Sequence, residues 1–122
     1  MHNGPLRSLT RRRDFEVVFR EGSNFVSRYL VIYARPNEFE TSRFGLSVSK
    51  KVGKAVVRNR LKRLIREAMR KGLEGNPLRY DFVVIARKSS VRAALDDFIR
   101  DIKSVVTRLV NEKDSDITYK VV

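Results

Sequence analysis

KKVGKAVVRNRLKRLIREAMRK, residues 50–71, is the segment around which we expect the chain to fold. It contains ten Lys and Arg residues and one acidic residue, Glu67, so it carries +9 of the chain's formal net charge of +13. From Val57 onward, apolar residues recur at the three- and four-residue spacing of an amphipathic helix. These apolar residues are Val57, Leu61, Leu64, Ile65, Ala68 and Met69. The spacing predicts a helix with one apolar and one strongly basic face, which Gly72 would end as its C′ residue.

The basic face of this helix indicates an anionic partner. Most charged helix faces are only solvated, and their charges are usually mixed. Here nearly all the charges have one sign, and like charges four residues apart destabilise an isolated helix. Guanidinium groups match phosphate oxygens in pairs, and each neutralised phosphate releases condensed counterions. The pattern therefore favours nucleic acid over a merely solvated face.

Length and composition narrow the class of protein. A chain of 122 residues is long enough for one hydrophobic core, and we expect a single domain. The sequence has no cysteine, which excludes disulfides and thiolate metal sites and suits a cytoplasmic protein. The longest apolar runs, residues 29–34 and 82–86, fall far short of the roughly 20 residues of a membrane span. No apolar segment follows the basic N-terminus, so we expect no signal peptide. The apolar seam of the basic helix has too few large aromatic residues to favour binding to an anionic membrane surface.

Strands and helices are expected on both sides of the basic helix. Periodicity predicts a helix over residues 11–20 with Thr10 as its cap, strands over 25–34, 43–49 and 80–87, and a long helix reaching about residue 110. With two or three strands before the basic helix, the order is α-β-β-β-α-β-α. The fold class is therefore α+β, with a sheet of about four strands. The domain should span residues 9–110, between a flexible N-terminus (1–8) and a loose C-terminal tail (111–122).

Two features of the strand over residues 43–49 bear on a site. Its Phe44, Leu46 and Val48 point to one face, whereas the other face carries only small residues. That bare face leaves room for a ligand or for a closely packed helix. This strand and the strand after the basic helix could be parallel neighbours joined by a crossover, which is ordinarily right-handed.

Residues 47–67, SVSKKVGKAVVRNRLKRLIRE, resemble the signature of the bacterial ribonuclease P protein subunit, with Arg58-Asn59-Arg60 at its core. The resemblance extends from about Leu9 to Val110. It implies a rare left-handed crossover that carries the Arg-Asn-Arg segment. It also implies an endoribonuclease in which the RNA subunit holds the active site and its Mg²⁺ ions. The protein then helps that RNA to remove the 5′ leader of precursor tRNA.

The resemblance assigns residues to two RNA partners. The residues assigned to the catalytic RNA are Lys50, Lys51, Lys54, Arg58, Asn59, Arg60, Lys62, Arg63 and Arg66. The residues assigned to a cleft for the 5′ leader are Arg13, Phe15, Phe19 and Tyr33. Without the resemblance, periodicity alone would place both phenylalanines in the core. Tyr33 could then be an ordinary β-sheet tyrosine with a buried ring and a solvent-exposed hydroxyl. Nothing in the sequence decides the oligomeric state, and we expect a monomer.

The sequence predicts no catalytic residue and no metal site in the protein itself. Asp14, Glu16, Glu21 and Asp81 have no spacing that forces them to converge on metal ions, and His2 is the only histidine. Two other functions remain open. The chain could be a structural RNA-binding protein of the ribosomal kind, which serves no reaction. It could also bind duplex DNA, in which case the basic helix should stand free of the sheet.

Overall fold

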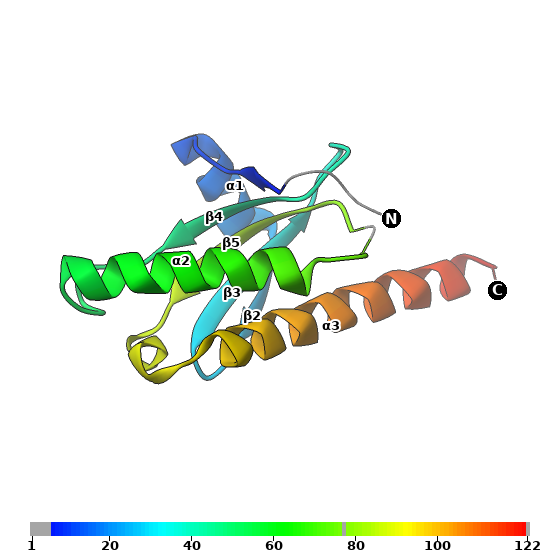
Figure 1. Cartoon of the computed structure of the whole chain (residues 1–122). Helices are drawn as coiled ribbons and strands as arrows, with labels where there is room; N and C mark the ends of the chain where they lie inside the picture. The colour runs from blue at the N-terminus through cyan, green and yellow to red at the C-terminus, as the bar shows by residue number, and fades with distance from the viewer. Residues whose placement is uncertain (1–5, 77, 122) are drawn as a thin grey trace.

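A mixed sheet of five strands separates the helices into two layers, with α1 on one face and α2 and α3 on the other (Figure 1). The computed structural model describes residues 6–76 and 78–121, with side chains described as far as residue 112. The elements in chain order are β1 (Arg7–Ser8), α1 (Arg12–Glu21), β2 (Ser23–Val26), β3 (Leu30–Pro36), β4 (Arg43–Ser47), α2 (Ala55–Gly72), β5 (Tyr80–Ala86), the 3-10 helix η1 (Lys88–Arg92) and α3 (Leu95–Val121). The predicted α+β class is confirmed, and β1 adds one strand to the expected four.

The strand β5 lies at the centre of the sheet, whose order is β1-β4-β5-β3-β2. It pairs in parallel with β4 and antiparallel with β3. Phe82, Val83 and Val84 are each at most 1% exposed, because helices cover both faces of the sheet. A continuous apolar run is the sequence signal of such a strand, and this prediction is confirmed.

The connection from β4 through α2 to β5 is a left-handed crossover. In Figure 1, β4 and β5 both run from right to left, β5 lies below β4, and α2 crosses in front of the sheet. A right-handed connection would have placed β5 on the other side of β4. The handedness implied by the resemblance is therefore present in this chain.

The main core lies between the sheet and the layer of α2 and α3. Leu61 and Ile65 of α2 and Phe98 of α3 are fully buried there. Gly72 does not act as a C′ residue, as the sequence suggested, because it is the last residue of α2. A Cβ atom on Gly72 would lie 2.5 Å from Cγ2 of Ile102. The glycine therefore lets α2 and α3 approach closely, and the left-handed turn residue is Gly75, with φ of 75°.

The predicted strand over residues 25–34 is wrong, because the segment forms a hairpin of β2 and β3. The turn between them is held by Ser27, whose Oγ accepts a hydrogen bond from the N–H of Leu30 at 3.1 Å. The same hydroxyl donates to Oδ2 of Asp101 in α3 at 2.7 Å. Ser27 and Arg28 are the only interruption of the apolar residues between Phe25 and Ala34, and no Gly or Pro marks the turn, so the pattern alone predicted one strand.

The two ends of the domain also differ from expectation. Residues 7 and 8, assigned to a flexible N-terminus, pair in parallel with β4, and the following Leu9 is only 5% exposed. Residues 1–5 lie outside the described residues. The helix α3 continues to Val121, where a loose tail was expected from residue 111. No Gly or Pro occurs after residue 110, so nothing in the chain breaks the helix once its apolar face ends.

Candidate nucleic-acid interface

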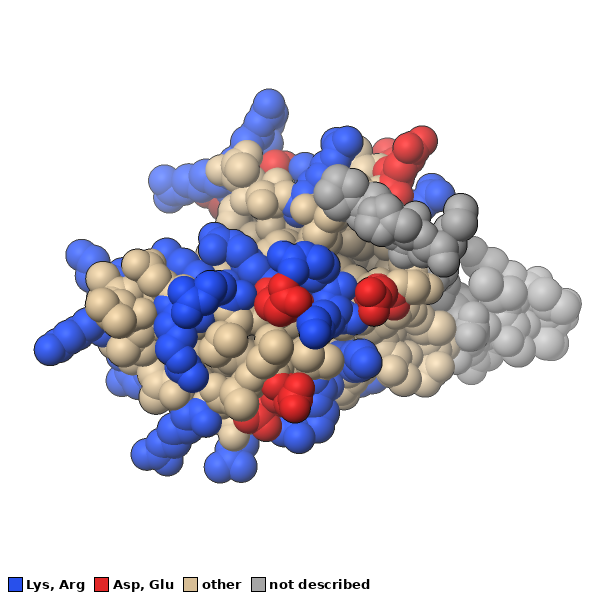
Figure 2. Space-filling model, in the orientation of Figure 1, with Lys and Arg blue, Asp and Glu red and all other residues tan. Residues whose placement is uncertain are grey.

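Basic side chains gather on the solvent side of α2 and of the turn that leads into it, and blue atoms cover much of this face in Figure 2. We call this the basic surface. Its exposed members are Lys50, Lys51, Lys54, Asn59, Arg60, Arg63 and Arg66. The opposite side of α2 is anchored by Leu61, Ile65, Ala68 and Met69, none of which is exposed to solvent. Because α2 is packed down along its length, the cations all face outward.

Arg58 and Lys62 differ from the other members of the basic surface because both are half-buried. The Nε of Arg58 donates to the carbonyl oxygen of Gly53 at 3.1 Å. Arg58 therefore fixes the turn before α2 in addition to presenting a positive charge. At the other end of the helix, Glu67 forms ion pairs with Arg70 and Lys71, so the C-terminal part of α2 is partly neutralised.

The start of α2 is electrostatically unfavourable for an isolated helix. Its first turn contains no acidic residue, and its N-cap, Lys54, makes no side-chain capping hydrogen bond. Negative charge near a helix N-terminus is stabilising, whereas Lys54 and the nearby Lys50 and Lys51 are positive. An anion bound at this end would supply the missing negative charge. The arrangement therefore favours phosphate groups as the partner.

The opposite face of the sheet carries an aromatic pair. The rings of Phe19 from α1 and Tyr33 from β3 meet edge to face, with centroids 5.0 Å apart and planes at 87°. Phe19 is 41% exposed, although large aromatic side chains usually bury most of their surface. A ring this exposed can offer a face to a flat partner, and nucleic-acid bases stack on aromatic rings regardless of base identity.

Beside this pair, the strand register places a row of residues that the sequence did not single out. Val31 pairs with both Val26 and Ile85, and Ser47 pairs with Ile85, so the four residues form one row across the sheet. Val26 is 66% exposed and Ser47 is exposed, while Val31 and Ile85 are half-buried. Phe19, Tyr33 and this row together make up what we call the aromatic surface. Only the pairing of distant strands reveals the row.

Phe15 lies on the same helix but is packed differently from Phe19. It is half-buried against a small core group that includes Val18 and Val83. Its ring rests directly on Gly45 of β4, where an added Cβ would lie 2.2 Å from Cζ of the ring. The bare face of β4 is therefore filled at Gly45 by the closely packed helix. Arg13, the fourth residue assigned to the leader, is exposed on α1.

Ion pairs attach α1 to the sheet at both ends. Asp81 of β5, 3% exposed, accepts two hydrogen bonds from Arg43, at 2.9 Å from Nε and 2.6 Å from Nη2. Arg43 also lies 3.6 Å from Oδ2 of Asp14 in α1, and its hydrogen bonds to Asp81 raise its pKa. Near the C-terminus of α1, Arg35 donates to Glu21 at 3.0 Å, and this hydrogen bond lowers the pKa of Glu21.

The carboxylates of the described residues do not fit a Mg²⁺ site. Asp14 and Asp81, which the sequence gave no reason to bring together, converge on the guanidinium of Arg43 and are already paired with it. Across residues 6–76 and 78–121, no group of three or more His, Cys, Asp or Glu side chains could hold a metal ion. Within the same residues, no helix is long and apolar enough to cross a membrane.

Three comparisons with known proteins bear on this arrangement. Residues 5–110 match the family model for ribonuclease P. The ribonuclease P protein component of Clostridioides difficile (strain 630) is 46% identical over 103 residues, covering 84% of this chain and 90% of the relative. The structure of Staphylococcus aureus RNase P protein has a TM-score of 0.74 at 31% identity, covering 86% of this chain and 96% of that one. The Thermotoga maritima protein has a TM-score of 0.73 at 35% identity, with coverage of 84% and 96%.

The left-handed crossover, the basic surface on α2 and these matches define a small RNA-binding protein that acts in tRNA processing. The chain belongs to the ribonuclease P protein family. Membership implies an RNA partner and a role in the ribonuclease P ribonucleoprotein. A ribosomal-type protein is not favoured by the matches. Duplex DNA binding called for a free-standing helix, whereas α2 contributes four buried residues to the core.

Proposed function

We propose that the basic surface binds the RNA subunit of ribonuclease P, while the aromatic surface holds the 5′ leader of precursor tRNA. The observation that supports this division is the position of the two surfaces on opposite faces of one sheet. Cations that form no ion pair within the protein suit a folded polyanion, and exposed rings beside an apolar row suit an extended single strand. Each RNA would therefore have its own face of the protein.

Recognition by ring faces also suits the substrate. An enzyme that processes many precursor tRNAs meets leaders of many sequences, and stacking on Phe19 requires no particular base. The open row of Val26, Val31, Ile85 and Ser47 adds apolar contact area next to the rings. Arg13, exposed on α1, would contact the phosphates of the same strand.

In this proposal the chemistry belongs to the RNA subunit. The reaction hydrolyses one phosphodiester bond, releases the leader and leaves a 5′ phosphate on the mature tRNA. Mg²⁺ bound by the RNA would activate water and stabilise the leaving oxygen. The carboxylates of the described residues offer no such site, and Asp81 and Asp14 are engaged by Arg43. The protein's part is to bind and position the two RNAs.

Reconstitution tests the proposed function. Purified chain should restore leader cleavage when it is added to ribonuclease P RNA at a Mg²⁺ concentration where the RNA alone is slow. RNA binding without any gain in cleavage would indicate a purely structural RNA-binding protein. Cleavage of precursor tRNA by the chain alone, with all RNA removed, would overturn the assignment of the chemistry.

Two variants test the aromatic surface. Loss of one stacking platform is worth roughly 1–3 kcal/mol, so Phe19→Ala should weaken binding of leader-bearing precursor about 5- to 150-fold and leave mature tRNA binding unchanged. Phe39→Ala is the matched control. Phe39 is also exposed, but it belongs to the connection between β3 and β4, where its ring stacks on the guanidinium of Arg43. An equal loss in both variants, or for both ligands, would contradict the assignment.

The salt dependence of RNA binding tests the basic surface. Five or six phosphate contacts predict a slope of log affinity against log salt of roughly −4 to −5. Arg63→Gln and Arg66→Gln should each reduce its magnitude by about 0.7 to 0.9. A slope near zero, or variants with the wild-type slope, would exclude the basic surface as the RNA-subunit contact.

A further inference from the structure

Two arginines outside α2 lie at the β1 edge of the sheet. Arg7 belongs to β1, and Arg11 is the residue immediately before α1; both are exposed. Their backbone is fixed, because the N–H of Leu9 donates to Phe44 in β4 at 2.9 Å and the carbonyl oxygen of Arg11 accepts from Asp14 at 3.0 Å. Both side chains therefore project from an ordered sheet edge.

Neither arginine is neutralised by the fold. Among the described side chains, no carboxylate lies within 4.0 Å of the guanidinium of Arg7 or Arg11, and the same holds for Arg63 and Arg66 of α2. The neighbouring arginines of α1 differ in this respect. Arg12 pairs with Glu16, and Arg20 pairs with Glu21. The charges of Arg7 and Arg11 thus remain available to an external anion.

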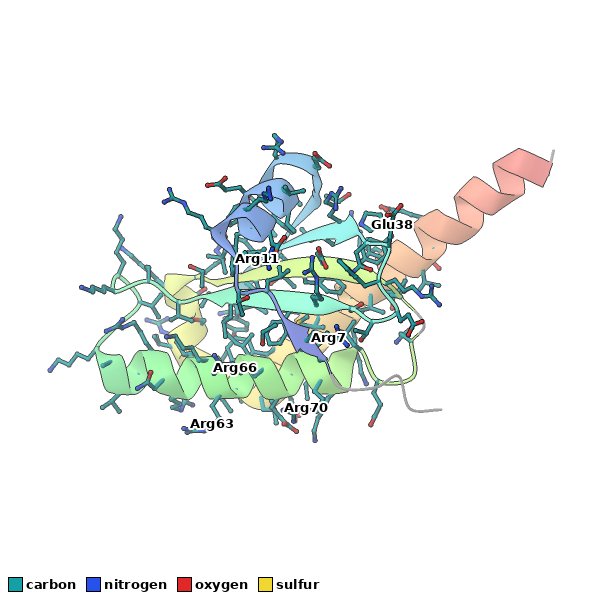
Figure 3. The ribbon with its side chains drawn as sticks, turned by 90° about the horizontal axis from the view of Figure 1, so that it is seen from above. Arg7, Arg11, Glu38, Arg63, Arg66 and Arg70 are labelled. Atoms are coloured by element: carbon teal, nitrogen blue, oxygen red, sulfur yellow. The ribbon has the colours of Figure 1, made fainter. Side chains whose placement is uncertain are left out.

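The positions of these side chains join them to the basic surface. Seen from above in Figure 3, β1 lies between the C-terminal half of α2 and the start of α1, near Arg11. Arg7 lies between Arg11 and the α2 arginines Arg66 and Arg70 in this view, whereas the labelled Glu38 lies apart from them. In Figure 2, blue atoms likewise continue from α2 toward the β1 edge. The cations form one band that turns around this edge.

We infer that Arg7 and Arg11 extend the basic surface and bind backbone phosphates of the RNA subunit. This inference rests on the proposed function of α2. The RNA subunit is favoured over the leader because the band leads to α2, whereas the most exposed apolar residue of the aromatic surface, Val26, lies on β2 at the opposite edge of the sheet. Guanidinium groups spaced along a band suit the repeated phosphates of a folded RNA backbone.

The test is the affinity of Arg7→Gln/Arg11→Gln for protein-free ribonuclease P RNA across a salt series. Two lost phosphate contacts should reduce the magnitude of the slope of log affinity against log salt by about 1.4 to 1.8. If the variant and the wild type bind equally at 1 M salt, the variant should bind up to ~60-fold more weakly near 0.1 M salt. Arg12→Gln/Arg20→Gln removes the same amount of charge from the two ends of α1, but from paired arginines. It should change affinity less than about 3-fold.

Each outcome decides the inference. An equal loss in the two double variants would show a general effect of net charge and would overturn it. If Arg7→Gln/Arg11→Gln weakens binding of leader-bearing precursor but not of mature tRNA or of the RNA subunit, Arg7 and Arg11 contact the leader. That result would also overturn the inference. If Arg63→Gln and Arg66→Gln reduce the slope while Arg7→Gln/Arg11→Gln does not, only this inference fails. Thermal unfolding should show both double variants folded, since all four side chains are exposed.

Discussion

Replacing Gly45 by alanine should disturb the aromatic surface through Phe15. The added Cβ would lie 2.2 Å from Cζ of Phe15, so the ring must move by about 1.2 Å to reach ordinary contact. Overpacking of this kind costs about 1–3 kcal/mol, and alanine in a strand regains about 0.5–1 kcal/mol over glycine. The expected net loss in the free energy of unfolding is therefore about 0–2.5 kcal/mol, centred near 1 kcal/mol, measured by urea denaturation.

The same substitution should affect function selectively. Phe19 is four residues beyond Phe15 on α1, so a shift of the helix changes how Phe19 meets Tyr33. We expect at least about a 3-fold loss in affinity for leader-bearing precursor, because part of a stacking contact worth roughly 1–3 kcal/mol is lost. The contacts of α2 with the RNA subunit should stay unchanged, since α2 lies on the other face of the sheet (Figure 1), so the affinity for the RNA subunit should fall less than the affinity for leader-bearing precursor.

Two further variants make the argument refutable. Gly45→Ala/Phe15→Leu removes the far atoms of the ring, so the cost of the added methyl should largely disappear and the double-mutant cycle should show coupling of about 1 kcal/mol. Ser47→Ala, on the same face of β4 but exposed, should change stability by less than about 0.5 kcal/mol. A Gly45→Ala protein with wild-type stability and leader affinity, or a cycle without coupling, would refute the reasoning.

Two other predictions concern stability. Asp81→Ala leaves Arg43 without its buried partner and should lower the free energy of unfolding by about 3–5 kcal/mol. Glu16→Gln removes an exposed partner of Arg12 and should change the free energy of unfolding by less than about 1 kcal/mol. Similar urea midpoints for the two variants would contradict this prediction. Asp97 accepts a hydrogen bond from the N–H of Ala94 at 2.8 Å, which lowers its pKa. Because the folded pKa lies below the unfolded value of about 3.9, wild type should be more stable than Asp97→Asn above pH ~4, and the difference should vanish as the pH falls through the folded pKa. A difference independent of pH in urea titrations would exclude this cause.

The parts of the fold that were predicted correctly have strong local patterns. The apolar seam of α2 repeats over four turns, and Leu61 and Ile65, which define it, are fully buried. Once the seam faces the core, the cations between its members must face water, so the basic surface follows from the same periodicity. The run from Phe82 to Ala86 likewise identified β5 as the central strand. In these segments a few residues determine both structure and exposure.

Other features depend on contacts between distant residues, which no local pattern records. Asp14 and Asp81 meet at Arg43 only because α1 folds over β4 and β5. Gly72 looked like a helix terminator, but its lack of a side chain serves the contact with Ile102 in α3. The row beside the aromatic pair required the register of four strands. Strand pairing, rather than composition, thus determines the details of the candidate site.

The distribution of acidic residues explains how one small domain can be strongly basic and still hold together. The arginines that fix α1 to the sheet are paired with Asp14, Glu21 and Asp81, so these three carboxylates stabilise the contact between α1 and the sheet. On α2 the only acid is Glu67, and it pairs near the C-terminal end. The cations of the basic surface are therefore held in place by apolar packing and not by ion pairs. Packing leaves their charge uncompensated, so an RNA phosphate can bind them without first displacing a carboxylate of the protein.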